Sequence, residues 1–197
     1  YALFSIIFST LFLFASYFFA WFVVKNIPIS FRGEYSYKLI KAALWFMVIS
    51  SIGPWAISVV MVTLGSTSIW YKLSIYFYLH FQYNGWFILA LCGVLFFIFE
   101  NSGVIISKLM FGQFFKLIIL SIIFSFFLST LWIEPPFIFY ILAGAGAILQ
   151  ILAFWKLFKI FMQNRGKIKT FIKPFTLFLL KLAGAFLAIK IILQLLT

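Results

Sequence analysis

Six apolar runs, each long enough to cross a lipid bilayer, limit most strongly what this chain can fold into. A helix needs about 20 apolar residues to cross the hydrocarbon core. Because unpaired backbone groups are costly in hydrocarbon, each run is expected to be helical. We therefore predict an all-α fold, a polytopic transmembrane helix bundle that forms a single domain over residues 1–197. The expected spans are residues 1–24, 42–65, 73–99, 117–133, 135–155 and 174–197.

The composition excludes a water-soluble domain. Hydrophobic residues make up 66% of the chain and charged residues 9%, whereas soluble domains average about 25% charged residues. The mean hydropathy of +1.20 points to hydrocarbon as the surrounding solvent. With 1 Cys and 1 His, the segment alone provides neither a disulfide framework nor a multi-histidine or zinc site.

The basic residues predict the direction of the spans. The formal net charge is +12, and twelve of the basic residues fall in the expected loops 25–41, 100–116 and 156–173. All three loops lie on the same side of the membrane, which the positive-inside rule identifies as cytoplasmic, so residue 1 is expected on the outer side. The charge thus reports orientation in a lipid bilayer, and we expect no nucleic-acid partner.

The first residues suggest that the segment belongs to a longer chain. It opens on Tyr1, without an initiating methionine or the basic region of a signal peptide. A chain normally starts inside, so an outward start predicts an odd number of earlier spans. A protein that simply begins outside the membrane is the alternative.

Polar side chains concentrate in the third expected span, where each needs a hydrogen-bonding partner. Tyr76, His80 and Asn84 follow one helix face at four-residue spacing, with Tyr83 alongside. Gln82 is expected to point to the opposite side. A rise of about 1.5 Å per residue places His80 about 10 Å below the outer boundary.

Three interpretations of His80 follow from its position. The imidazole could bond a hydroxyl or carbonyl within the bundle, which periodicity alone favours. It could be an axial ligand of haem iron, which requires a neutral ring nitrogen, an apolar pocket and an acceptor for the other nitrogen. It could also be a protonatable group on a transport path.

The segment around His80 resembles known membrane proteins. His80–Trp86 reads HFQYNGW and has the form H-F-x-x-x-G-W. It resembles the histidine-bearing helices of the haem-copper oxidase subunit I superfamily and of the nitric-oxide-response membrane protein NnrS. Together with Ser50–Pro54, it is similar to the C-terminal half of uncharacterised bacterial polytopic proteins, whose N-terminal half carries a second such helix. The resemblance is strongest over residues 45–95.

This resemblance implies a haem-copper-oxidase-like half in the bacterial inner membrane, with a haem-binding or redox-accessory role. It maps His80 onto a haem-ligand position, and Tyr76, Tyr83 and Asn84 become candidates to surround the ligand. The N-terminal half or a partner membrane subunit would supply any further ligand, so we do not expect a complete enzyme from this segment. The alternative is a small-molecule transporter or a structural membrane subunit without a cofactor.

Three further features have structural interpretations. Pro54 cannot bond the Ser50 carbonyl and should kink the second span. The run Ala143–Ala147 predicts close approach of two helices rather than phosphate binding. Lys181 lies about 10 Å into the sixth span. We expect its side chain to snorkel to the cytoplasmic surface, with a proton-relay or anion-contact role as the alternative.

Overall fold

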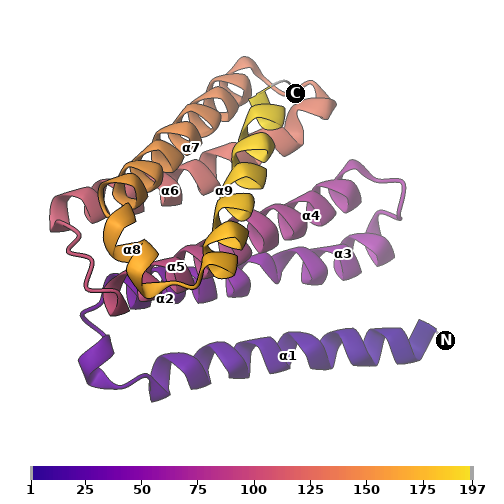
Figure 1. Cartoon of the computed structure of the whole chain (residues 1–197). Coiled ribbons are helices and arrows are strands. Elements are labelled where there is room, and N and C mark those ends of the chain that lie inside the picture. Colours follow the sequence, from indigo (N-terminus) through magenta and orange to yellow (C-terminus); the bar gives the residue numbers. More distant parts are fainter. Residues whose placement is uncertain (1, 196–197) are drawn as a thin grey trace. The chain divides into compact units, whose positions relative to one another are not determined.

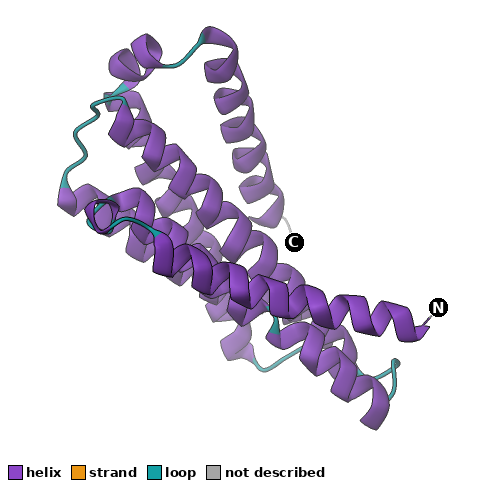
Figure 2. Ribbon diagram, turned by 90° about the horizontal axis from the view of Figure 1, so that it is seen from below, coloured by secondary structure: helices purple, strands orange, loops and turns teal. Residues whose placement is uncertain are grey.

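The computed structural model describes residues 2–195, apart from the side chains of residues 2, 3, 5, 6 and 195. Every regular element in this part of the chain is helical (Figures 1 and 2). The predicted all-α polytopic bundle is confirmed, because 6 helical stretches are long and apolar enough to cross a membrane. They are Ile7–Asn26, Tyr35–Thr63, Ile69–Asn101, Lys108–Ile133, Phe137–Gln163 and Pro174–Gln194. The outer ends of the first and sixth predicted spans, residues 1, 196 and 197, lie outside the described residues.

The helices extend further than the hydropathy pattern predicted. α7 (Phe137–Gln163) continues through Lys156 and Lys159, which the sequence placed in a loop. Long lysine side chains can reach the membrane interface from the last turns of a helix, so charge does not end the helix there. Most of the predicted loop 156–173 is therefore helical, and it also contains the short helix α8 (Arg165–Phe171).

The chain forms two compact units, Tyr1–Val94 and Leu95–Thr197, which are described separately. α5 (Ile88–Asn101) contributes its first residues to unit 1 and its last residues to unit 2. The other elements of unit 1 are α1 (Ala2–Asn26), η1 (Ile29–Phe31), α2 (Tyr35–Ser50), α3 (Ile52–Thr63), α4 (Ile69–His80) and η2 (Phe81–Phe87). Those of unit 2 are α6 (Lys108–Ser125), η3 (Phe126–Ile133), α7, α8 and α9 (Pro174–Leu195).

In unit 1 the second span is broken at Ser51, between α2 and α3. Pro54 has no amide hydrogen, so the Ser50 carbonyl lacks its usual helical partner. The hydroxyls of Ser50 and Ser51 bond the carbonyls of Met47 and Val48 at 2.7 and 2.6 Å. The disturbance predicted at Pro54 is found as a one-residue interruption of the α-helix at Ser51, which keeps right-handed helical backbone angles.

Three glycines bring the second and third spans of unit 1 into close antiparallel contact. At Gly53 and Gly85 an added Cβ would lie 2.6 and 2.7 Å from the base of a neighbouring side chain, which leaves no room for a larger residue. At Gly93 it would lie 2.6 Å from the end of the Ile40 side chain, which would have to move. The pairs are Gly53 with Tyr78, Gly85 with Phe46 and Gly93 with Ile40. α1 packs on the outside of this pair, where Ala20 contacts Leu44 and Met47 of α2.

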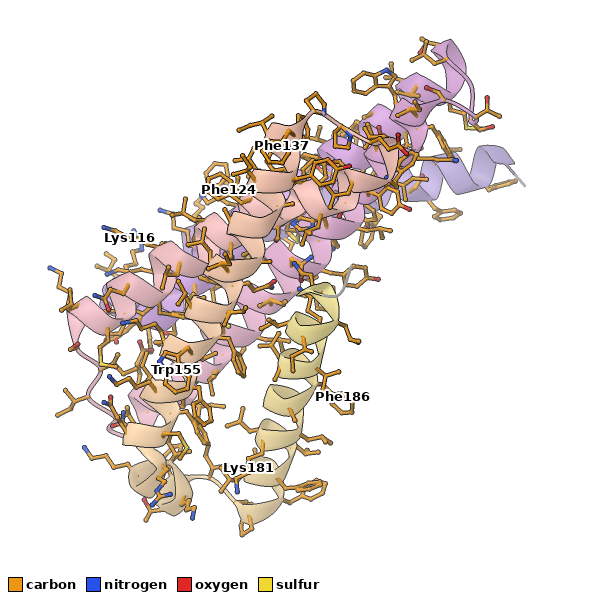
Figure 3. The ribbon with its side chains drawn as sticks, turned by 90° about the horizontal axis from the view of Figure 1, so that it is seen from above. Lys116, Phe124, Phe137, Trp155, Lys181 and Phe186 are labelled. Carbon is orange, nitrogen blue, oxygen red and sulfur yellow. The ribbon has the colours of Figure 1, made fainter. Side chains whose placement is uncertain are left out.

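In unit 2 the antiparallel helices α6 and α7 lie side by side. A Cβ on Gly146 would overlap the backbone of Ser125, whereas one on Gly144 would point into open space. The predicted close approach through Ala143–Ala147 is therefore confirmed at Gly146. Large apolar side chains such as Trp155 of α7 and Phe186 of α9 are exposed (Figure 3). Such outward faces suit contact with lipid.

Candidate functional site

The H-F-x-x-x-G-W segment coincides with a π-helix in unit 1. His80 is the last residue of α4, and Phe81–Phe87 form the π-helix η2. π-helical turns are rare and frequently occur at functional sites. The sequence predicts a regular α-helix over this span, because an apolar run carries no local signal for the change in helix type.

His80 is enclosed by the protein, with 8% of its surface exposed. The ring of Phe81 meets the imidazole edge-on at 5.1 Å between centroids. Phe81 itself packs against Phe46 of α2 and Phe77 of α4. On the polar side of the ring, Asn84 Nδ2 lies 3.3 Å from His80 Nδ1. The imidazole therefore has aromatic surroundings and a polar contact at Nδ1.

The Asn84 contact decides which ring nitrogen offers a lone pair. When the Asn84 amide nitrogen donates to Nδ1, the ring hydrogen of a neutral imidazole sits on Nε2. When the amide oxygen faces Nδ1 instead, that hydrogen sits on Nδ1, and Nε2 can bind a metal. Rotation of the amide by half a turn, together with transfer of the ring hydrogen from Nε2 to Nδ1, would therefore give an imidazole whose Nε2 can bind a metal.

The two predicted tyrosines lie elsewhere on the helix surface. Tyr76 is 41% exposed and Tyr83 is 59% exposed. Tyr83 stacks on Phe87, at 5.8 Å between ring centroids. The structure therefore brings Asn84 to His80 and leaves both tyrosines on the outer face of the third span. Helical spacing groups residues on a face, but it does not reveal which of them neighbouring helices cover.

Gln82 connects the π-helix to the break in the second span. The Ser50 hydroxyl hydrogen lies between two acceptors, Gln82 Oε1 and the Met47 carbonyl, each 2.7 Å from Ser50 Oγ. Because Ser50 is the last residue of α2, the two irregular backbone segments lie at the same level. Irregular backbone at membrane depth is tolerated where protein buries it or where it lines a cavity.

A second group of hydrogen bonds joins α1 to the same break. Trp55 Nε1 donates to the Tyr17 hydroxyl at 2.9 Å, and Tyr17 Oη lies 2.5 Å from Ser51 Oγ. Since Ser51 donates to the Val48 carbonyl, the Tyr17 hydrogen must point to Ser51. Sequence reasoning missed Tyr17, because a single tyrosine in an apolar run carries no signal of its partner.

The described residues contain no group of three or more His, Cys, Asp or Glu that could hold a metal ion. His80 offers one nitrogen ligand, and Asn84 can orient it. Lys181 belongs to unit 2, where it is exposed near the start of α9 (Figure 3). Further along α9, Lys190 Nζ bonds Gln194 Oε1 at 2.5 Å.

Comparisons with family models, with curated proteins and with solved structures find no match for this chain. The functional interpretation therefore depends on the geometry around His80 and on the resemblance of its motif.

Proposed function

We propose that this integral membrane protein is a haem-copper-oxidase-like or NnrS-like half that binds haem through His80, in a haem-binding or redox-accessory role. The single observation that carries the proposal is the buried His80–Asn84 pair. The imidazole is buried with the Phe81 ring against it, and Asn84 Nδ2 lies 3.3 Å from Nδ1. With the amide turned by half a turn, its oxygen would accept the Nδ1 hydrogen. These are the surroundings that an axial imidazole needs.

The residues present fit one axial ligand. Haem bound there would supply one-electron or gas-binding chemistry at its iron. With its amide turned so that the oxygen faces the ring, Asn84 would hold the ring orientation and accept the Nδ1 hydrogen, which would leave the lone pair on Nε2. The aromatic side chains of Phe81, Phe77 and Phe46 exclude water and lower the local dielectric, which influences a reduction potential. An N-terminal half or a partner subunit would supply any second axial ligand.

The test is the absorption spectrum of the purified full-length protein after haem supplementation. His80 is the only histidine of the segment, so His80→Ala removes every imidazole in it. We expect a Soret band that is lost in His80→Ala and retained in the control Tyr83→Phe, whose hydroxyl is on the exposed face. The absence of a band in the native protein, or an unchanged band in His80→Ala, would overturn the proposal.

A second candidate function is small-molecule transport, which the coincidence of two irregular helices favours. Transporters build substrate sites from discontinuous helices. In such a protein, His80, Gln82 and Asn84 would contact the substrate, and the break before Pro54 would act as a hinge. A Ser50→Cys variant in a Cys92→Ala background tests this function. Labelling by an impermeant maleimide from both sides of the membrane supports transport, and labelling from neither side contradicts it.

We also propose that the protein lies in the bacterial inner membrane with residue 1 on the outer side. The bias of basic residues toward one set of loops supports this orientation.

A further inference from the structure

Two buried polar atoms of unit 2 have no hydrogen-bond partner among the described residues. They are Ser125 Oγ, at the end of α6, and Gln150 Oε1, in the middle of α7. Ser125 is 1% exposed and Gln150 is 3% exposed, so neither can turn to an outside partner. Buried polar atoms in native proteins are almost always bonded, so each of these needs a partner.

The packing of α6 against α7 places Ser125 beside the turn of α7 that precedes Gln150. The backbone of Ser125 lies directly against Gly146, which is one helical turn before Gln150. Side chains on a helix lean toward its N-terminus, so Gln150 leans back toward Gly146 and therefore toward Ser125.

The two atoms also have complementary roles. The hydroxyl of Ser125 can donate, whereas the amide oxygen of Gln150 can only accept. The neighbouring hydroxyl of Ser121 lies one turn earlier on α6 and already bonds the Ile118 carbonyl at 2.8 Å. Ser121 therefore has a hydrogen-bond partner, whereas Ser125 Oγ and Gln150 Oε1 still need one.

The backbone changes from an α-helix to a 3-10 helix after Ser125. α6 ends at Ser125 and continues as the 3-10 helix η3. A 3-10 stretch of this length within a span often marks a hinge or local strain. On the facing helix, the buried residues beside Gly146 are small, namely Ala143 and Ala147. The polar pair thus sits where α6 changes helix type and where α7 presents little side-chain bulk.

We propose that Ser125 and Gln150 form an internal binding site for one water molecule between α6 and α7. Ser125 Oγ–H donates to the water oxygen, and the water donates to Gln150 Oε1. The water satisfies Ser125 Oγ and Gln150 Oε1 and joins the two helices at the start of η3 (Figure 3 labels Phe124, the preceding residue). Buried waters typically satisfy polar groups that have no other partner.

The first test compares unfolding midpoints of the purified full-length protein in detergent. If Ser125 and Gln150 share a water, Ser125→Ala and Gln150→Met each lower the midpoint. The double variant then falls no further than the worse single variant, because one water serves both residues. Ser121→Ala is the matched control for loss of a buried serine hydroxyl, and its effect should add to that of Gln150→Met. Single variants that leave the midpoint unchanged or raise it, or a double variant with fully additive loss, would overturn the proposal.

An experimental structure that resolves ordered waters provides the second test, which does not depend on any variant folding. A water within about 3.2 Å of both Ser125 Oγ and Gln150 Oε1 is expected. A dry contact, or a direct bond from either side chain to another protein group, would contradict the site.

Discussion

Asn84 is the residue on which the chemistry of His80 depends. Its amide can present either a nitrogen or an oxygen to Nδ1, and these two arrangements place the imidazole hydrogen on opposite ring nitrogens. In the arrangement in which the Asn84 amide oxygen faces Nδ1, that oxygen accepts the Nδ1 hydrogen and the lone pair lies on Nε2. The metal-binding capacity of the segment is therefore a property of the pair.

A first prediction concerns the Asn84 amide. Asn84→Leu removes the partner of Nδ1 at similar volume, so haem affinity should fall about 10–100-fold. Asn84→Asp offers a carboxylate to Nδ1–H, which makes the imidazole a stronger donor and lowers the reduction potential of the iron. Haem titration and redox potentiometry measure these effects. Equal haem affinities and reduction potentials in the native protein, Asn84→Leu and Asn84→Asp would show that Asn84 does not act on His80.

At the scale of the helix, α1 is held to unit 1 by few polar contacts. Tyr17 is the centre of these contacts, because it accepts from Trp55 and bonds Ser51 at the break in the second span. Outside this point α1 contributes mainly an apolar surface, with Ala20 in contact with α2. The hydroxyl of Tyr17 therefore has a larger role than its position in an apolar run suggests.

The second prediction tests this hydroxyl. Tyr17→Phe leaves the Trp55 indole without its acceptor and should lower the free energy of unfolding by about 1–2 kcal/mol. Tyr140→Phe is the control, because Tyr140 is exposed on α7. Unfolding of the purified protein in detergent measures both. A Tyr17→Phe variant as stable as Tyr140→Phe would contradict the role of Tyr17.

The third prediction concerns the close approach of α6 and α7. Gly146→Ala places a methyl group against the Ser125 backbone, so the helices must separate, at a cost of about 1–3 kcal/mol. Gly144→Ala, two residues away, adds a methyl group in open space and should leave stability unchanged or slightly higher. Unfolding midpoints compare the two variants, and similar losses would argue against the packing described here.

At the scale of the whole molecule, the membrane spans could be predicted from the sequence. Most of the irregular backbone segments and polar contacts within these spans could not. Hydrocarbon thickness and backbone hydrogen bonding determine the number of apolar helices, and both can be applied to a single sequence. The interruption at Ser51 is also predictable from Pro54, because the lack of an amide hydrogen on proline is visible in the sequence itself. Other features depend on which helices meet and in what register. They are the π-helix after His80, the Tyr17 contacts and the Gln150 amide oxygen that lacks a partner among the described residues. Neither hydropathy nor spacing contains that information.

The fourth prediction tests orientation in the membrane. In a Cys92→Ala background, single cysteines at Gly33 and Gly166 mark two basic loops, and one at Thr67 marks the loop between α3 and α4. An impermeant maleimide added to intact cells should label the Thr67→Cys variant and leave the other two unlabelled until the cells are opened. The reverse pattern would place residue 1 inside.

The most direct test of the central claim observes the imidazole of His80 itself. In protein labelled with ¹⁵N-histidine, spectra of the 197-residue segment contain the signals of one imidazole. After addition of ferrous haem and carbon monoxide, we predict that Nδ1 carries the ring hydrogen and that the Nε2 signal shifts as it binds iron. Ring signals that are identical before and after haem addition would contradict a haem-binding role for this protein.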